Sequence, residues 1–346
     1  MSQETVERLL AEGETLLKDE QSVEALAVFE QVLELAPQQA RAWNGKGLAL
    51  SKLDRNEESL AAYVRATAED VTYAGAWRNL GILYRRLQRP EDALSAYERA
   101  TSYNAQDAHS HFNKSVLLLF ELHDPEAALE AVQQAIEQDS THADYHHLQG
   151  HALSDLGRHE EALVSYTASL RLKADQAEVQ TDVGAALGSL QRHEEAVAAF
   201  DCALAVDPTF ARAHLNRGIA LRHLDRPEEA LTAFQHSIAL DPDGVPSRQL
   251  QAETLLALRR YEEAGHAYVR AIKLQAGNAG LYAGLGQAMM ALQRYQHAAV
   301  AFDYAVHVNP EFAQAWLERG RALRELGRLE EAEEAFEEAR KLGLDA

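Results

Sequence analysis

The segment Trp77-Arg-Asn-Leu80-Gly81-Ile-Leu-Tyr84, followed by Ala93-Leu-Ser-Ala-Tyr97-Glu-Arg-Ala100, decides the fold because it recurs along the chain. A shift of 34 residues toward the N-terminus places similar residues at the same positions, namely Trp43, Gly47, Ser59, Tyr63 and Ala66. Shifts toward the C-terminus give the same agreement to the end of the chain. A period of this length indicates one supersecondary unit repeated many times.

The period divides about residues 4–346 into a single array of ten repeats, without a linker or low-complexity tract. The repeats are 6–39, 40–73, 74–107, 108–142, 143–176, 177–210, 211–244, 245–278, 279–312 and 313–346. The fourth is one residue longer than the others, with the extra residue near His123-Asp124.

Three positions of the repeat are nearly constant, and we call them the Gly, Ala and aromatic columns. The Gly column holds Gly13, Gly47, Gly81, Gly150, Gly184, Gly218, Gly286 and Gly320, with Ser115 and Ala252 as exceptions. The Ala column holds Ala25, Ser59, Ala93, Ala128, Ala162, Ala196, Ala230, Ala264, Ala298 and Ala332. The aromatic column holds Phe29, Tyr63, Tyr97, Tyr166, Phe200, Phe234, Tyr268, Phe302 and Phe336, with Val132 as the exception.

Each repeat carries two apolar stretches with the i, i+3, i+4, i+7 spacing of amphipathic helices, separated by a short polar turn. Pro90, Pro125 and Pro227 fall in that turn. Because proline suits the first turn of a helix, the first helix is predicted to end near Leu87 or Leu224 and the second to begin at the proline. We expect the Gly and Ala columns to let the two helices touch, and the aromatic column to fill the gap to the next repeat. Stacking then supplies the core.

This pattern resembles the tetratricopeptide repeat, whose Trp-x₂-Leu-Gly-x₂-Tyr…Ala-x₃-Phe…Pro signature has the same period. The closing prolines of that signature correspond to Pro37, Pro208, Pro242 and Pro310. The resemblance covers essentially the whole chain. It implies an all-α, right-handed superhelical solenoid of ten helix-turn-helix repeats. The final helix is heavily charged, and Gly343 stands where a C-terminal cap is expected.

Composition excludes several classes of partner. The chain has 33 Lys and Arg against 54 Asp and Glu, a net charge of −21, which repels phosphate backbones and anionic lipids. We therefore expect no nucleic-acid partner. The longest dense apolar stretch, Val116 to Phe120, is too short to enter a membrane directly, and the N-terminus lacks a secretion signal. The single cysteine, Cys202, cannot form an internal disulfide. These features predict a cytoplasmic protein.

Motifs for catalysis are missing from the sequence. No segment matches a phosphate-binding loop, a nucleophile elbow, a zinc-protease helix or paired C-x-x-C, so we expect no enzyme activity and no cofactor. Histidines offer one metal candidate, because Asp144, His147 and His151 share a helix face with ligand-like spacing. The alternative is a polar wall with chance histidine pairs.

In the family that the chain resembles, the first helix of each repeat lines a concave groove that holds peptides. The resemblance implies that the corresponding residues bind a partner here. These residues are Arg41, Asn44, Lys52, Arg78, Asn79, Arg85, Arg86, His109, Phe112, Asn113, Val116, Leu119, Phe120, Arg212, Asn216 and Arg222. The arginines of repeats two and three meet no acid in the same columns, which favours capture of carboxylates by guanidinium groups.

The expected function is a non-catalytic scaffold or adaptor that binds a peptide segment, acidic or C-terminal, with an apolar anchor against Phe112 and Phe120. The arginines could instead be merely solvated, and Leu119 and Phe120 could pack the longer turn of repeat four. Ile82 and Asp144 depart from the two-carboxylate clamp of co-chaperone repeats. Two alternatives remain: a self-assembling homo-oligomeric scaffold, and a substrate-recruiting subunit of a separate enzyme.

Overall fold

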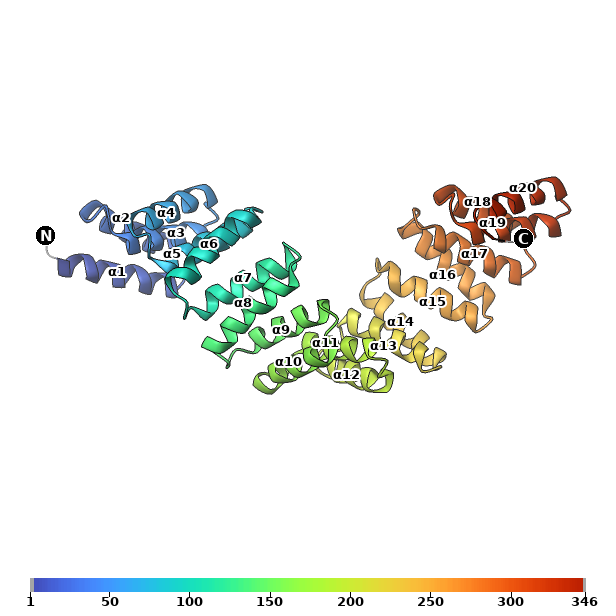
Figure 1. Cartoon of the computed structure of the whole chain (residues 1–346), viewed down its shortest axis with the longest axis horizontal. Coiled ribbons are helices and arrows are strands. Elements are labelled where there is room, and N and C mark those ends of the chain that lie inside the picture. The colour runs from blue at the N-terminus through green and yellow to red at the C-terminus, as the bar shows by residue number, and fades with distance from the viewer. Residues whose placement is uncertain (1–2, 345–346) are drawn as a thin grey trace. The chain divides into compact units, whose positions relative to one another are not determined.

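The structure, a computed structural model, describes residues 3–344, which form twenty α-helices and no strand (Figure 1). The odd-numbered helices are α1 (Gln3–Lys18), α3 (Ala40–Lys52), α5 (Ala74–Arg86), α7 (Ala108–Phe120), α9 (Ala143–Asp155), α11 (Ala177–Ser189), α13 (Ala211–His223), α15 (Val245–Ala257), α17 (Ala279–Ala291) and α19 (Ala313–Glu325). The even-numbered helices are α2 (Ser22–Leu35), α4 (Asn56–Glu69), α6 (Pro90–Tyr103), α8 (Pro125–Gln138), α10 (His159–Leu172), α12 (His193–Val206), α14 (Pro227–Leu240), α16 (Tyr261–Leu274), α18 (Tyr295–Val308) and α20 (Leu329–Lys341). The predicted all-α fold of ten helix pairs is confirmed.

Helix boundaries follow the local sequence. From α3 on, every odd helix begins at the first residue of a predicted repeat, and α6, α8 and α14 begin at their prolines as expected. In the longer repeat four, the Asp124 side chain accepts a hydrogen bond from the Ala127 backbone N–H and so caps α8. At the other end of the chain, Gly343 follows α20 with a φ of 90°, the left-handed conformation of a C-terminal cap.

The turn within each helix pair also uses the left-handed conformation. The residue after Leu53 is Asp54 with a φ of 56°, and the Arg55 N–H then donates to the Leu50 carbonyl at 3.0 Å. This bond satisfies one of the free carbonyls at the end of α3. Non-glycine residues take this conformation in eight repeats: Glu20, Asp54, Gln88, His123, Gln191, Asp225, Arg259 and Gln293. Glycine takes the position only in repeats five and ten, as Gly157 and Gly327.

The Gly column lies directly against the aromatic column of the same repeat. A Cβ atom built on any glycine of the column would stand 2.3–2.7 Å from a ring carbon of its own repeat. The missing side chain leaves space for the ring within the pair. The ring also reaches the next repeat, as expected: a Cβ atom built on Gly45 would stand 2.4 Å from the Phe29 ring, and Tyr63 packs against Leu80. Repeat four shows the converse: Ser115 replaces glycine and donates to the Ala128 carbonyl at 2.7 Å, and the smaller Val132 replaces the ring.

A third recurrent contact fixes the turn between repeats. The indole N–H groups of Trp43, Trp77 and Trp316 each donate to the carbonyl six residues earlier, at 2.7–2.9 Å. Imidazole rings make the equivalent bond elsewhere, from His111, His146 and His214 at 3.0–3.1 Å. These histidines therefore have structural partners.

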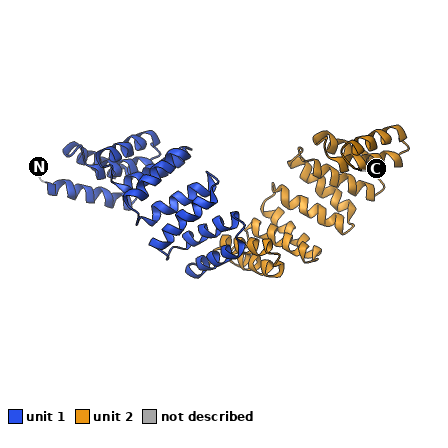
Figure 2. Ribbon diagram, viewed as in Figure 1, with its two compact units in different colours: residues 1–174 blue, residues 175–346 orange. Residues whose placement is uncertain are grey.

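The chain divides into two compact units, unit 1 over residues 1–174 and unit 2 over residues 175–346 (Figure 2). Each unit is a two-layer stack of helix pairs. The expectation of a single array from residue 4 to residue 346 stays a prediction. None of the helices in residues 3–344 combines the length and the apolar composition that crossing a membrane requires.

Candidate functional site

The candidate site in unit 1 is the inner face, which we define as the surface of α3, α5, α7 and α9. Consecutive odd helices contact each other, whereas the even helices of successive repeats are held further apart. A stack whose odd layer is more closely spaced curves toward that layer, so the odd helices line its concave side. All predicted binding residues lie in unit 1 except Arg212, Asn216 and Arg222.

The arginines of the inner face are already paired with carboxylates of their own or of a neighbouring repeat. Arg78 donates to Asp107 at 2.5 Å and Arg85 donates to Glu121 at 2.7 Å. Arg41 bridges two acids on α1, at 2.8 and 3.1 Å from its guanidinium nitrogens. These acids limit the expected capture of ligand carboxylates by the arginines. Glu7 occupies the column of Arg41 one repeat earlier. The other acids, Glu14, Asp107 and Glu121, lie in other columns or in turns, so a comparison within one column does not find them.

Asp107 is the most enclosed of these acids. Its carboxylate accepts hydrogen bonds from Ser110 Oγ at 2.7 Å and from Arg78 at 2.5 Å. Burial by itself raises the pKa of Asp107, but the Ser110 hydrogen bond and the Arg78 charge outweigh it, so the pKa lies below its ordinary value. The carboxylate therefore stabilises the folded state in its charged form.

We expect Asp107→Asn to lower the free energy of unfolding by about 1–3 kcal/mol at pH 7. Because the pKa of Asp107 is depressed in the folded state, its contribution is present above the ordinary carboxyl pKa of about 4. It is lost as the pH falls through the folded-state value. Denaturant melts of both proteins at pH 7 and pH 3 should show a difference that shrinks at the lower pH. An unchanged difference would contradict this assignment.

Two cations of the inner face remain without a carboxylate. Within residues 3–344, Lys52 Nζ donates only to the Leu17 carbonyl at 3.1 Å, and Arg86 donates only to Ser51, to its carbonyl and hydroxyl oxygens at 3.1 Å. Lys52, Arg86 and Phe120 are the last residues of α3, α5 and α7 and occupy the same position of three successive repeats. We call them the terminal row. Phe120 is 52% exposed, which leaves its ring available to a ligand.

Aromatic rings gather at the start of α7 and α9, at the opposite end of these helices from the terminal row. The rings of Phe112 and Tyr145 lie 4.9 Å apart, and His142 stacks on Tyr145 at 4.8 Å, with His109 against both His142 and Tyr145. Val116 is half-buried on the same helix. Leu119 is only 3% exposed, so its predicted role in binding is wrong. It belongs to the core, because α7 packs against α6, α8 and α9.

Two of the predicted asparagines are engaged within the protein. Asn79 donates to the side-chain oxygen of Asn44 at 2.9 Å, and Asn44 donates to the Tyr73 hydroxyl at 3.4 Å. The side chain of Asn113, one repeat further, makes no hydrogen bond within residues 3–344. Of the three predicted asparagines in unit 1, Asn113 is therefore the one whose side chain has no internal partner. Asn216 belongs to unit 2.

The candidate metal ligands are only partly brought together. His147 and His151 lie side by side on α9, with ring centroids 4.5 Å apart. Asp144 is exposed and does not join them: no third His, Cys, Asp or Glu of residues 3–174 places a ligand atom within 4.8 Å of both. The hypothesis of metal binding therefore rests in unit 1 on two imidazoles and stays a prediction.

Unit 2 holds the remaining predicted residues and a cavity of about 300 Å³. Asn216 lines it, opposite the small side chains of Ala185, Gly188 and Ser189 on α11. Arg212 and Arg222 are paired with acids, Asp182 at 3.0 Å and Glu253 at 3.2 Å. The stacked imidazoles of His193 and His223, 4.5 Å apart, also line the cavity and were not predicted.

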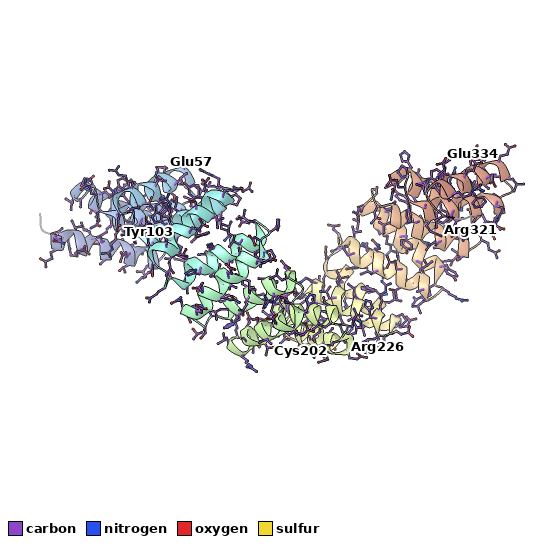
Figure 3. All side chains as sticks on the ribbon, in the orientation of Figure 1. Glu57, Tyr103, Cys202, Arg226, Arg321 and Glu334 are labelled. Atoms are coloured by element: carbon purple, nitrogen blue, oxygen red, sulfur yellow. The ribbon has the colours of Figure 1, made fainter. Side chains whose placement is uncertain are left out.

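The lone cysteine offers no sign of catalysis. Cys202 lies on α12 and is exposed (Figure 3). Its neighbour Asp201 is ion-paired with Arg217 at 2.6 Å, so this carboxylate is engaged elsewhere.

Comparison with known families agrees with the repeat period. A sequence profile described as tetratricopeptide repeat matches residues 113–177, 184–245 and 284–345, more than half of the chain. The chain belongs to the tetratricopeptide repeat family. A second profile, for the N-terminal tetratricopeptide repeat region of Psidin, matches residues 15–117. Tetratricopeptide repeat proteins generally mediate protein–protein interactions.

Solved tetratricopeptide repeat structures share the fold. The C-terminal part of a repeat protein from Cytophaga hutchinsonii is 18% identical over 69% of this chain and 98% of its own, with a TM-score of 0.56. PilF from Pseudomonas aeruginosa is 19% identical over 63% and 98%, with a TM-score of 0.53. YrrB, described as having an unusual peptide-binding site, is 22% identical over 54% and 95%, with a TM-score of 0.50. No curated protein sequence matches significantly.

Proposed function

We propose that this tetratricopeptide repeat protein is a non-catalytic adaptor that binds a partner segment on the inner face of unit 1. The observation that carries the proposal is the terminal row. Lys52 and Arg86 present positive charge that no carboxylate of residues 3–344 neutralises, and the exposed ring of Phe120 follows in the next repeat. A segment with carboxylates followed by an apolar residue matches this order.

The ion pairs of Arg78 and Arg85 change which cations are expected to bind the carboxylates of an acidic ligand. An acidic segment would have to displace Asp107 or Glu121 to reach Arg78 or Arg85, and that exchange gains little free energy. Lys52 and Arg86 have only carbonyl and hydroxyl partners, so a ligand carboxylate adds a charge pair there without breaking one. The Asn113 amide supports an extended ligand backbone, and the ring of His151 lies beside the anchor, 5.9 Å from the ring of Phe120.

A peptide selection tests the proposal. We would select random 12-residue peptides on the wild-type chain and measure the affinity of enriched peptides for Lys52→Glu/Arg86→Glu. We expect peptides with acidic residues before an apolar one, and a loss of about tenfold or more in the variant. Basic or charge-free enriched peptides, or equal affinity for both proteins, would refute the proposed site.

A matched control separates site effects from net charge. Arg55→Glu/Arg89→Glu makes the same change in charge, but these arginines pair with Glu58 and Asp92 at the start of even helices. We expect the control to bind the enriched peptides as the wild type does. Light scattering on the same samples distinguishes the alternative of a self-assembling scaffold, because that reading requires oligomers that the Lys52→Glu/Arg86→Glu variant loses.

A further inference from the structure

Unit 2 contains an apolar groove away from the odd-helix face. It lies between α16 and α18, with side chains of α17 at its floor, and has a volume of about 550 Å³. Tyr282, Leu285 and Met289 of α17 form the floor. The walls carry large apolar side chains that are exposed to solvent: Val269 is 40%, Val300 44% and Tyr304 54% exposed.

The groove exists because repeats eight and nine depart from the pattern of the array. Gly265 stands where seven other repeats have a leucine or valine: Leu26, Leu60, Leu94, Leu129, Leu163, Val197 and Leu231. Those side chains fill the equivalent space elsewhere, as Leu231 does at 3% exposure. At Gly265 the tips of two side chains of α17 approach: a built Cβ would stand 2.8 Å from Met289 Cε and 3.9 Å from Leu285 Cδ1.

The walls depart from the pattern in the same direction. Val269 occupies a position that is polar in every other repeat except repeat two, which has Val64 there. Tyr304 is the one aromatic residue at a position held elsewhere by polar or small side chains such as Arg65 and Arg99. One missing leucine would be an ordinary packing defect. A missing leucine with apolar residues added on both walls makes a larger apolar surface open to water, which marks interaction sites.

Charge around the groove identifies the partner. Glu262 is the only acid that lines it, and Glu262 is paired with Arg294 at 2.9 Å at one end. Lys273, His266 and His297 line the rim, and Lys273 makes no ion pair within residues 3–344. Lys273 therefore gives the rim a positive charge that no acid lining the groove neutralises, on a chain with a net charge of −21. A complementary ligand carries acidic residues beside its apolar contacts.

The shape fits a helix. The two walls are helices of 14 residues each, so the groove can run for roughly 21 Å, the length of a helix of similar size. We propose that this groove, between α16 and α18, binds an amphipathic helix of a partner protein, with apolar residues at i, i+3, i+4 and i+7 and acidic residues on the flanks. The site is separate from the terminal row of unit 1.

The test restores the repeat pattern. A library of 14-residue helical peptides is selected on the full chain, and enriched peptides are then measured against Gly265→Leu and Tyr304→Arg. Each variant places at its position a residue that other repeats already carry there. We expect acidic amphipathic peptides that lose about tenfold or more in affinity for either variant. Gly265→Leu places its side chain against Met289 and can therefore disturb the fold. Tyr304→Arg changes an exposed side chain and leaves the packing intact, so a loss of affinity in this variant reports on the groove alone.

The remaining outcomes are decisive as well. Lys52→Glu/Arg86→Glu should bind these peptides as tightly as the wild type, which separates this groove from the site in unit 1. Enriched peptides that are basic, or that bind both groove variants unchanged, would overturn the proposal. Oligomers of the wild type that disappear in Gly265→Leu and Tyr304→Arg would also overturn it, because the occupant would then be a second copy of the chain.

Discussion

Phe200→Ala is expected to lower the free energy of unfolding by about 3–5 kcal/mol. The ring is 2% exposed, lies against Gly184 and borders the cavity of about 300 Å³ in unit 2. Its removal would enlarge a space that is already incompletely filled, so the surrounding helices cannot collapse easily. Denaturant melts followed by circular dichroism measure the effect.

Phe120→Ala is the matched control for that experiment. It makes the same chemical change on a side chain that is 52% exposed, so its effect on stability should be small. Equal midpoints for Phe200→Ala and the wild type would show that the aromatic column does not hold the repeats together. Because the sixth repeat packs on the seventh through α12 and α13, the loss should also loosen the helix pair of repeat seven.

Gly218→Ser is expected to lower the free energy of unfolding by about 1–3 kcal/mol through overpacking. A Cβ atom at Gly218 would stand 2.5 Å from the Phe234 ring, and that ring is fully buried. Adding Phe234→Val should cost less in the serine background than in the wild type, because repeat four already combines Ser115 with Val132. A double-mutant cycle measures this coupling.

Gly188→Ser serves as the control for helix propensity. Gly188 also lies in an odd helix, but a Cβ atom there would meet nothing within 4 Å. The substitution should leave stability nearly unchanged or raise it, since glycine is a poor helix former. Additive costs in the Gly218–Phe234 cycle would show that the two columns are independent, contrary to the packing described above.

The fold could be predicted from the sequence where a residue type is restricted to one structural position. Proline cannot sit inside a helix, so Pro90, Pro125 and Pro227 located the starts of three helices. Glycine opposite an aromatic ring recurs because the ring needs the space of the missing side chain. The contact between the ring and the glycine of its own repeat was not predicted, because periodicity fixes which positions are buried without fixing every neighbour that a side chain contacts.

The candidate site was less predictable, because charge pairing depends on three-dimensional neighbours. Asp107 and Glu121 lie in turns, outside the columns of the arginines that they neutralise. Leu119 and Phe120 were both predicted to bind a partner, but Leu119 is 3% exposed and Phe120 is 52% exposed. A usable signal was present for the groove of unit 2: Gly265 interrupts a run of leucine and valine at one position of the repeat.

Substitutions in the turns within the helix pairs can change the free energy of unfolding of this protein without changing the residues proposed to bind partners. Eight of them hold a side-chain-bearing residue in the left-handed conformation, which costs about 1–2 kcal/mol relative to right-handed backbone and which glycine adopts without that penalty. Each turn can therefore be strengthened by one local exchange, such as Gln88 or Arg259 to glycine. Repeats five and ten already carry glycine there, so their turns avoid this cost and the turns of the other eight repeats do not. Lifetime and specificity can then evolve separately, since the residues that govern one are not those that govern the other.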